Sequence, residues 1–275
     1  VTDKIAECWE LSFHKDGPCL IDSGLDKGKK LSDVATEEDI GTYASSFPFF
    51  PVLIKLIDSG DNLSVQVHPS DEYALKNENS FGKTEMWHVL SHEEGAGLYV
   101  GLKEDSSKEE IEDALKKSTI LEKLNFYAVE DGEDYFIPAG TIHAIGKGMT
   151  VIEIQQNSNL TYRLYDYNRL GKDGKPRELH IQKALKVIDY KKYSPIKFEG
   201  NCIGRCKYFS SYCKRVDGSS LLRADKESFM SITFLSGEGT VNKIPFKALD
   251  TFFIPAGKEA EILGKGEFVL TTVEK

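Results

Sequence analysis

One stretch of the chain occurs twice, and this internal repeat restricts the possible fold more than any other feature. The first copy, at 134–154, reads DYFIPAGTIHAIGKGMTVIEI, and the second, at 250–272, reads DTFFIPAGKEAEILGKGEFVLTT. The identical FIPAG segments begin at Phe136 and Phe253, an offset of 117 residues. Both copies continue through GKG into a stretch typical of a β-strand. Self-similarity of this kind indicates two copies of one structural unit.

Each copy is a run of short strands with turn residues between them, and Pro-Ala-Gly precedes a polar turn. This pattern is typical of a jelly-roll barrel of the cupin type. We therefore predict a mainly β chain of two cupin-type jelly-roll halves with a few peripheral helices. The catalytic barrel is expected over 1–190 and a degenerate second half over 191–275. The polar, proline-containing stretch 190–201 is the expected linker.

Two segments outside the strands read as helices. The stretch 106–124 is expected to form a helical insert in the first half, because Ser107 and Glu110 have the spacing of a capping box. The stretch 33–46 has an acidic first turn and reads as a short helix.

The repeat also separates the two halves chemically. At the offset of 117 residues, His143 of the first copy corresponds to Ala260 of the second. If His143 served only to fill the core, its replacement by Ala260 in the second copy would be difficult to explain. We therefore expect His143 to be functional and the second half to be structural and without a metal.

The composition narrows the range of partners. The net charge of −9 over 275 residues argues against binding to nucleic acid or to an anionic membrane surface. No stretch approaches the roughly 20 apolar residues that span a bilayer. The five cysteines are an odd number in a chain too large to need disulfides, so we expect a cytoplasmic protein.

Four side chains are candidates for metal binding. Gln66 and His68 alternate with valines and therefore share one face of a strand. Glu85 lies in the next strand, within GKTEMWH, and His143 lies in the turn after IPAG. Two neutral imidazoles, a carboxylate and an amide oxygen make a divalent-metal site with an open position, in which the amide is the weakest ligand. The same set could hold zinc or iron.

Two further histidines are left out of this set. His88 is expected on the opposite strand face from Glu85, and His92 lies in an acidic turn.

Basic side chains near these candidates suit an anionic substrate. Lys55 is a single charge in an apolar strand, Lys83 lies two residues before Glu85, and Arg163 lies ten residues after Glu153. Together they would give an acidic protein a local positive lining that can bind a phosphate. The alternative for each lysine is a surface position with its stem along apolar neighbours.

At this point the motifs resemble a known family. SVQVHPSDEYA, GKTEMWHVL, YFIPAGTIHAIGKG and TYRLYDYNR are similar to the type I mannose-6-phosphate isomerases, in particular to their short bacterial form. CWELS at 8–12 and RELHIQKALKVI at 177–188 extend the resemblance over nearly the whole chain. It implies a zinc enzyme that interconverts mannose 6-phosphate and fructose 6-phosphate. Because this family normally has a few dozen residues before the WELS stretch, it also implies a segment upstream of Val1.

The resemblance implies a role for each candidate. It makes Gln66, His68, Glu85 and His143 the ligands of one zinc ion per chain. It makes Arg163 the active-site arginine, places Glu153 near the reacting carbons, and puts Lys55, Ser64 and Lys83 in the sugar-phosphate pocket.

The reaction requires a base that moves a proton between C1 and C2 through an enediol. Arg163 stays protonated at neutral pH and is expected to hold the enediolate or the phosphate. Glu153 and Lys83 are both candidates for the base, and Lys83 would need a pKa lowered by the adjacent zinc and by burial.

Two other functions remain open on the sequence. An iron oxygenase of the cupin type would have no use for Lys55 and Lys83. A sugar-binding cupin without catalysis would bind the sugar phosphate without turnover.

Overall fold

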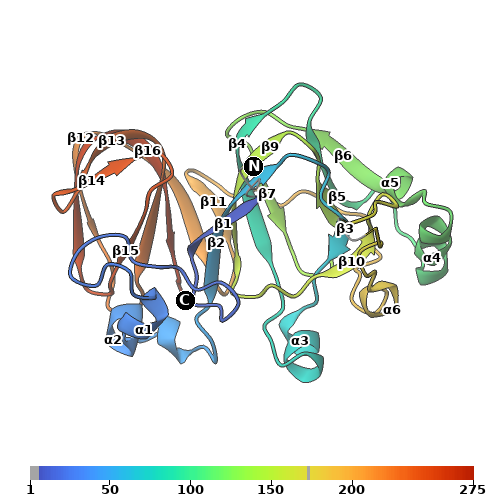
Figure 1. Cartoon of the computed structure of the whole chain (residues 1–275), viewed down its shortest axis with the longest axis horizontal. Coiled ribbons are helices and arrows are strands. Elements are labelled where there is room, and N and C mark those ends of the chain that lie inside the picture. The colour runs from blue at the N-terminus through green and yellow to red at the C-terminus, as the bar shows by residue number, and fades with distance from the viewer. Residues whose placement is uncertain (1–5, 172–173) are drawn as a thin grey trace. The chain divides into compact units, whose positions relative to one another are not determined.

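The computed structural model describes residues 6–171 and 174–275. The chain is mainly β, as predicted, and its strands form three sheets (Figure 1). The first sheet has the order β1 (Glu7–Leu11), β2 (Val52–Ser59), β9 (Met149–Gln156), β4 (Glu85–His92) and β7 (Asp134–Ile137). The second has the order β10 (Tyr162–Tyr165), β3 (Val65–Val67), β8 (His143–Ile145), β5 (Gly97–Leu102) and β6 (Leu124–Ala128).

The third sheet is formed by the C-terminal part of the chain. Its order is β11 (Cys202–Arg205), β12 (Ser210–Arg223), β16 (Glu259–Thr272), β13 (Met230–Val241) and β14 (Ile244–Lys247), and β15 (Thr251–Ile254) also pairs with β13.

The helices are short. They are α1 (Leu31–Val34), α2 (Glu37–Ile40), the 3-10 helix η1 (Ala44–Ser46), α3 (Asp71–Asn77), α4 (Lys108–Lys116), α5 (Ile120–Lys123) and α6 (Ile181–Ala184). Within the described ranges, the helices are too short and too polar to cross a membrane.

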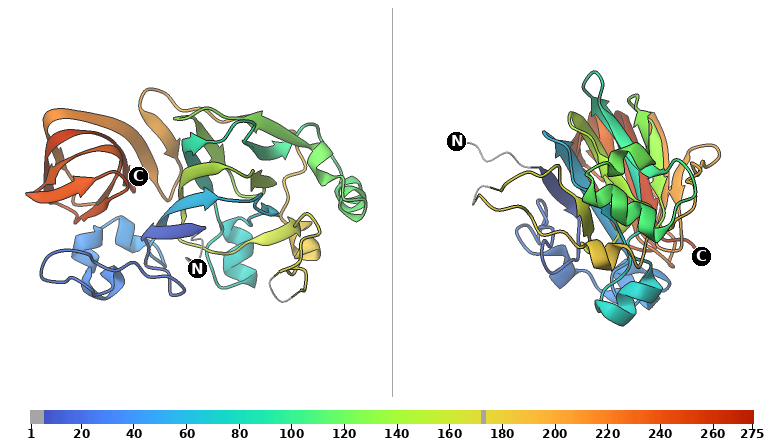
Figure 2. Two further views of the ribbon diagram at one scale, coloured as in Figure 1. Left: turned by 45° about the horizontal axis from the view of Figure 1, so that its top comes forward. Right: turned by 90° about the vertical axis from the view of Figure 1, so that its right-hand side faces the viewer.

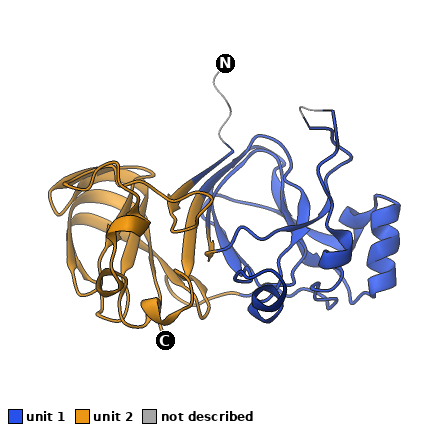
Figure 3. Cartoon of the chain, turned by 60° about the horizontal axis from the view of Figure 1, so that its bottom comes forward, with its two compact units in different colours: residues 1–8, 56–153, 158–196 blue, residues 9–55, 154–157, 197–275 orange. Residues whose placement is uncertain are grey.

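The chain divides into two compact units (Figure 3). Unit 1 comprises residues 1–8, 56–153 and 158–196, and unit 2 comprises 9–55, 154–157 and 197–275. This division differs from the contiguous ranges 1–190 and 191–275, chiefly in the placement of 9–55.

Residues 9–55 group with the C-terminal residues because they hydrogen bond to them and stack on them. The Phe229 amide donates to the Ile40 carbonyl at 3.0 Å, and the Thr42 amide donates to the Lys226 carbonyl at 3.1 Å. The ring of Phe50 stacks on that of Phe229 at 5.0 Å. These contacts join segments that lie far apart in the sequence, which composition does not reveal.

The interior of unit 1 lies between strands of its two sheets. Trp87 and Val89 of β4 share one buried apolar cluster with Leu98 and Val100 of β5 and with Ile145 of β8. Because side chains alternate along a strand, Glu85 has the same facing as Trp87 and Val89. His143 has the same facing as Ile145 for the same reason. The site candidates on these strands therefore face the inside of the barrel.

Three helices of unit 1, α4, α5 and α6, cover the outer face of its second sheet. Ile111 and Leu115 of α4, Ile120 of α5 and Ala184 of α6 share a second apolar cluster with Val67 of β3. Figure 2 shows α4, α5 and α6 beside these strands.

The helices predicted over 106–124 and 33–46 are each divided into shorter helices. The capping box of Ser107 and Glu110 is confirmed at the start of α4, but the chain breaks at Ser118, with φ of 57°, before α5 begins. The single helix predicted over 33–46 is wrong, because the segment forms α1, α2 and η1 instead. At Gly41 after α2, φ is 100° and a Cβ would lie 2.5 Å from the Ser228 amide, so the helix ends there.

The repeat is visible in both units. In both copies a strand ends within FIPAG, at the isoleucine before the proline, because β7 ends at Ile137 and β15 ends at Ile254. The copies differ after that, because GKG separates β8 from β9 in unit 1 but lies within the long β16 in unit 2. Ala260 is fully buried in the apolar cluster of unit 2.

Candidate metal centre

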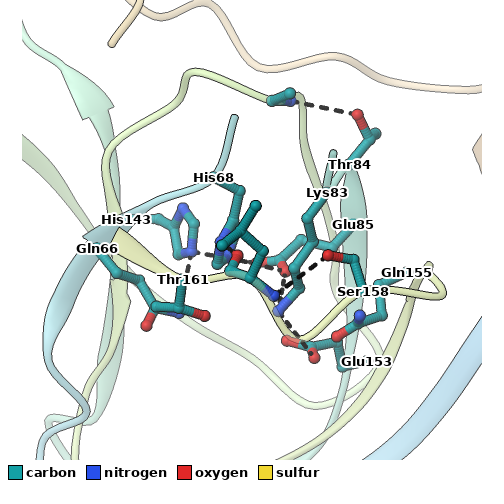
Figure 4. Close-up of polar contacts among 12 residues, drawn as sticks. Gln66, His68, Lys83, Thr84, Glu85, His143, Glu153, Gln155, Ser158 and Thr161 are labelled. Atoms are coloured by element: carbon teal, nitrogen blue, oxygen red, sulfur yellow. Dashed lines mark hydrogen bonds and ion pairs between the residues drawn. The ribbon is translucent and has the colours of Figure 1, made fainter. Parts of the chain in front are cut away.

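The second sheet of unit 1 places three polar side chains in one row. Gln66 of β3 is paired directly with His143 of β8 on one side and with Arg163 of β10 on the other. Directly opposed residues in antiparallel strands point to the same face. His68 follows immediately after β3, and Glu85 begins β4 in the first sheet. Figure 4 shows Gln66, His68, Glu85 and His143 converging.

Both histidines are oriented by backbone carbonyls. The Nδ1 of His68 lies 2.9 Å from the Leu160 carbonyl oxygen, and the Nδ1 of His143 lies 2.9 Å from that of Thr141. A carbonyl oxygen can only accept, so each Nδ1 carries the proton and donates it. Each Nε2 therefore presents a lone pair to the site when the ring is neutral. Such a second hydrogen bond is the usual way in which proteins orient metal-binding histidines.

Glu85 lies between the two imidazoles. Its Oε2 is 3.4 Å from His68 Nε2, and its Oε1 is 3.2 Å from His143 Nε2. All three side chains are buried, and one ligand atom from each lies within 4.8 Å of the others. Two imidazoles and a carboxylate so placed are a set that divalent zinc or iron accepts.

The protonation states of His68, His143 and Glu85 leave hydrogen-bond acceptors facing one another. Burial lowers the pKa of His68 to about 4 and lowers that of His143 as well, although Glu85 opposes both shifts. Burial would raise the pKa of Glu85, but the charge of the neighbouring Lys83 ammonium is the first of the opposing effects, and the pKa lies well below its usual value. Two neutral imidazole nitrogens therefore face a charged carboxylate.

A cation resolves this arrangement. Within the described residues, His68 Nε2 and both carboxylate oxygens of Glu85 are buried without a hydrogen bond. Buried polar atoms without a hydrogen bond are costly. Lys83 Nζ lies 3.0 Å from Glu85 Oε2, and a divalent metal between the three atoms would satisfy the others as well. The amide nitrogen of Gln66 lies 3.2 Å from His143 Nε2. Since an amide can be turned to exchange its oxygen and nitrogen, Gln66 can offer its oxygen to the same ion.

Lys83 and Glu153 form a second buried group beside these ligands. Lys83 Nζ lies 3.0 Å from Glu85 Oε2 and 3.5 Å from Glu153 Oε1. Trp87 Nε1 donates to the other oxygen of Glu153 at 3.0 Å. Burial acts to lower the pKa of Lys83, but Glu153 and Glu85 outweigh it and raise that pKa. The lowered pKa that Lys83 would need as a base is therefore not found among these protein groups. The two base candidates nevertheless lie within reach of each other.

Arg163 and Ser64 are also brought together. Arg163 Nε donates to Ser64 Oγ at 3.2 Å, and Ser64 is buried. Lys55 is placed differently, since it belongs to unit 2. There its ammonium lies 5.0 Å from the ring centre of Trp9, and its expected role toward the phosphate stays a prediction.

The excluded histidines make other contacts. His88 Nδ1 lies 2.8 Å from Asp134 Oδ1, and His92 Nδ1 lies 2.7 Å from Asp131 Oδ1.

Sequence reasoning missed Trp87 and the two backbone carbonyls. Trp87 could have been found, because it lies two residues after Glu85 and therefore shares its strand face. The carbonyls of Thr141 and Leu160 leave no signal in the sequence, because every residue carries one.

Comparisons with known proteins identify relatives of this chain. Residues 1–112 match the sequence model of the phosphomannose isomerase type I catalytic domain. The chain is 34% identical to the mannose-6-phosphate isomerase ManA of Bacillus subtilis, over 98% of this chain and 90% of that protein. It is also 34% identical to the mannose-6-phosphate isomerase of Streptococcus mutans, over 87% of this chain and 78% of the relative.

A solved structure shows the same fold. The crystal structure of the mannose 6-phosphate isomerase from Bacillus subtilis superposes with a TM-score of 0.86 at 33% identity, and the match covers 97% of this chain and 89% of that one. The predicted cupin-type fold is thereby confirmed. The chain belongs to the type I phosphomannose isomerase family.

Proposed function

We propose that this chain is a zinc-dependent isomerase that interconverts mannose 6-phosphate and fructose 6-phosphate. The observation that carries the proposal is the convergence of His68 Nε2, His143 Nε2 and the Glu85 carboxylate in one buried site. Membership of the family supports the substrate, because the relatives that share this fold are named as mannose-6-phosphate isomerases.

The metal would be held by Gln66, His68, Glu85 and His143, with one zinc ion per chain. Nitrogen and carboxylate oxygen are ligands that zinc accepts in catalytic sites. When bound, zinc would supply Lewis-acid polarisation of the sugar carbonyl.

The proton transfer is assigned to Lys83 and Glu153. Isomerisation removes a proton from one carbon of the opened sugar and returns one to its neighbour, so a donor and an acceptor must lie close together. The separation of 3.5 Å between Lys83 Nζ and Glu153 Oε1 allows these two groups to serve as such a pair. Trp87 holds the second oxygen of Glu153 and thereby fixes the plane of the carboxylate.

The anionic parts of the substrate are assigned to the basic side chains. Arg163 keeps its charge and would stabilise the enediolate or bind the phosphate, oriented by Ser64 through their hydrogen bond. Lys83 and Lys55 would add positive charge to the sugar-phosphate pocket.

In this proposal unit 1 binds the metal and unit 2 has a structural role. The metal ligands all belong to unit 1, whereas the position of His143 is taken in the repeat by Ala260, which is packed among apolar side chains. Unit 2 would therefore be a degenerate barrel that supports the fold without a metal.

A coupled assay that follows the formation of fructose 6-phosphate tests the proposal. Turnover is expected to stop on exhaustive chelation and to return with zinc. His143→Ala should abolish both zinc content and turnover, whereas His92→Ala, which alters a half-buried histidine outside the site, should preserve them.

Other results would favour the other functions. A protein that binds mannose 6-phosphate without converting it would be a sugar-binding cupin. Iron in the site together with no isomerisation would indicate an oxygenase.

A further inference from the structure

Asp166 is the centre of a charged cluster that the proposed reaction does not use. Its side chain is buried, and it accepts hydrogen bonds from two arginines. Arg177 donates from Nε to Oδ2 at 2.7 Å and from Nη2 to Oδ1 at 2.5 Å, and Arg169 Nη2 donates to Oδ1 at 2.6 Å. The two bonds from Arg177 form a bidentate fork, which is a strong and directional contact between these groups.

The backbone around Asp166 is shaped to make these contacts. A tight turn follows β10, in which the Arg169 amide donates to the Asp166 carbonyl at 3.0 Å. Tyr167 and Asn168, the central residues of the turn, both have φ of 55°. Positive φ is unfavourable for a tyrosine, so the surrounding contacts must compensate for this conformation. The turn brings Arg169 back onto the side chain of Asp166.

The segment after Arg177 holds Arg163 at three points. The carbonyl of Glu178 accepts from Arg163 Nη1 at 2.9 Å. The Arg163 amide donates to His180 Nδ1 at 3.2 Å, and the His180 amide donates to the Arg163 carbonyl at 2.7 Å. Both the backbone and the guanidinium of Arg163 therefore depend on where residues 178–180 lie.

These contacts close a ring. The chain runs three residues from Arg163 to Asp166, the fork joins Asp166 to Arg177, and Glu178 returns to the guanidinium of Arg163. The ring connects two of the family-like motifs, TYRLYDYNR and RELHIQKALKVI. We propose that Asp166 is a positioning residue, which fixes the guanidinium of Arg163 toward the substrate through Arg177 and the Glu178 carbonyl. This inference rests on the role given to Arg163 in the proposed function.

The charges in the cluster explain why a carboxylate stands at its centre. Arg163, Arg169 and Arg177 are close enough for their charges to influence one another. Like charges at short range repel, and Asp166 is the buried anion that accepts from two of them. Without its charge, Arg177 would lose the fork and the three guanidinium groups would separate.

The substitution Asp166→Asn tests the proposal, because it keeps the size of the side chain and removes its charge. We expect kcat/KM for mannose 6-phosphate to fall about tenfold or more, since a small misplacement of a catalytic group is costly. Zinc content should be unchanged. Asp61→Asn is the matched control, because Asp61 is exposed and accepts from Arg169 at 2.9 Å and from the Asn62 amide at 2.8 Å, outside the fork. It should leave kcat/KM within about twofold of the parent, since it leaves the fork intact.

A double-mutant cycle separates positioning from general damage to the fold. If Asp166 acts through Arg163, then Asp166→Asn should have little further effect on kcat/KM in an Arg163→Lys background. Equal fold losses in both backgrounds would overturn the proposal. Arg177→Lys keeps the positive charge but removes the fork, so it should reproduce the loss if Asp166→Asn does not fold.

A measurement that does not depend on turnover tests the positioning role of Asp166 separately from the proposed function. In arginine-labelled protein, the Nε–H signal of Arg163, identified by its loss in Arg163→Lys, should exchange slowly with solvent because it donates to Ser64. Asp166→Asn should accelerate this exchange at least tenfold, and Asp61→Asn should not. Unchanged exchange in Asp166→Asn would overturn the positioning role, whereas absence of isomerisation in the parent protein would overturn the proposed function.

Discussion

His68 and His143 present the same ring nitrogen, Nε2, to the two oxygens of Glu85, at 3.4 and 3.2 Å. Each ring is fixed by a hydrogen bond from its Nδ1 to a backbone carbonyl. The result is a buried cluster of electron-pair donors that contains a negative charge. Lys83 Nζ lies 3.0 Å from Glu85 Oε2, and a divalent cation between the three side chains would also satisfy the two imidazole nitrogens, which is the basis of the metal assignment.

Glu85→Gln should lower zinc affinity by more than about a hundredfold, because replacing even a group that only orients a ligand costs ten- to a hundredfold. The substitution preserves the size of the side chain and removes its charge. Zinc content after dialysis against a competing chelator measures the effect. Glu133→Gln, at an exposed carboxylate that accepts from the Tyr135 hydroxyl, is the control and should retain the metal. Equal zinc retention in the two variants would contradict the ligand assignment.

Trp87→Phe should lower kcat about tenfold or more while zinc remains bound. The variant keeps an aromatic ring but loses the hydrogen bond from Trp87 Nε1 to Glu153, so the carboxylate is less well oriented for proton transfer. Steady-state kinetics and metal analysis on the same sample measure the two effects. A variant that lost its zinc together with its activity would show instead that Trp87 supports the ligands, since its ring also contacts that of His143.

Ala260→His would restore in unit 2 the residue type that unit 1 has at the equivalent repeat position. We expect the free energy of unfolding to fall by about 1–3 kcal/mol, because the site is filled by apolar side chains such as Ile262 and Phe268. Zinc content should stay at one ion per chain, since the metal-ligand group found among the described residues lies in unit 1. Urea unfolding and metal analysis test both statements, and a second equivalent of zinc would contradict the view of unit 2 as structural.

The contribution of Asp166 to stability should depend on pH. Burial acts to raise the pKa of Asp166, but hydrogen bonds from Arg177 and Arg169 lower it from 3.8 to about 2. A lowered pKa stabilises the folded state above the ordinary pKa and loses this effect as the pH falls toward the folded value. The difference in urea midpoint between the parent and Asp166→Asn should therefore be largest near neutral pH and shrink between about pH 4 and pH 2. A difference that grew on acidification would contradict the ion pairing.

The sequence was sufficient to predict which polar side chains lie together where their placement depends on local spacing. Strand alternation placed Gln66 and His68 together, and the repeat identified His143 through its replacement by Ala260. The capping pair Ser107 and Glu110 predicted the start of α4 because capping is a local interaction.

The remaining features depend on contacts between distant segments. Phe50 stacks on Phe229 and both belong to unit 2, although the two residues lie 179 positions apart in the sequence. The carbonyls that orient His68 and His143 carry no side-chain signature. The fork between Asp166 and Arg177 joins two motifs that the sequence presents as separate. These relationships follow from tertiary structure, which local patterns do not encode.

Titration of the metal-free protein with zinc, with the rate of mannose 6-phosphate isomerisation followed at each step, tests the central claim most directly. The account predicts that activity rises linearly and saturates at one zinc per chain, and that His143→Ala stays inactive throughout. Full activity in the metal-free protein, or the same titration curve in His143→Ala, would contradict it.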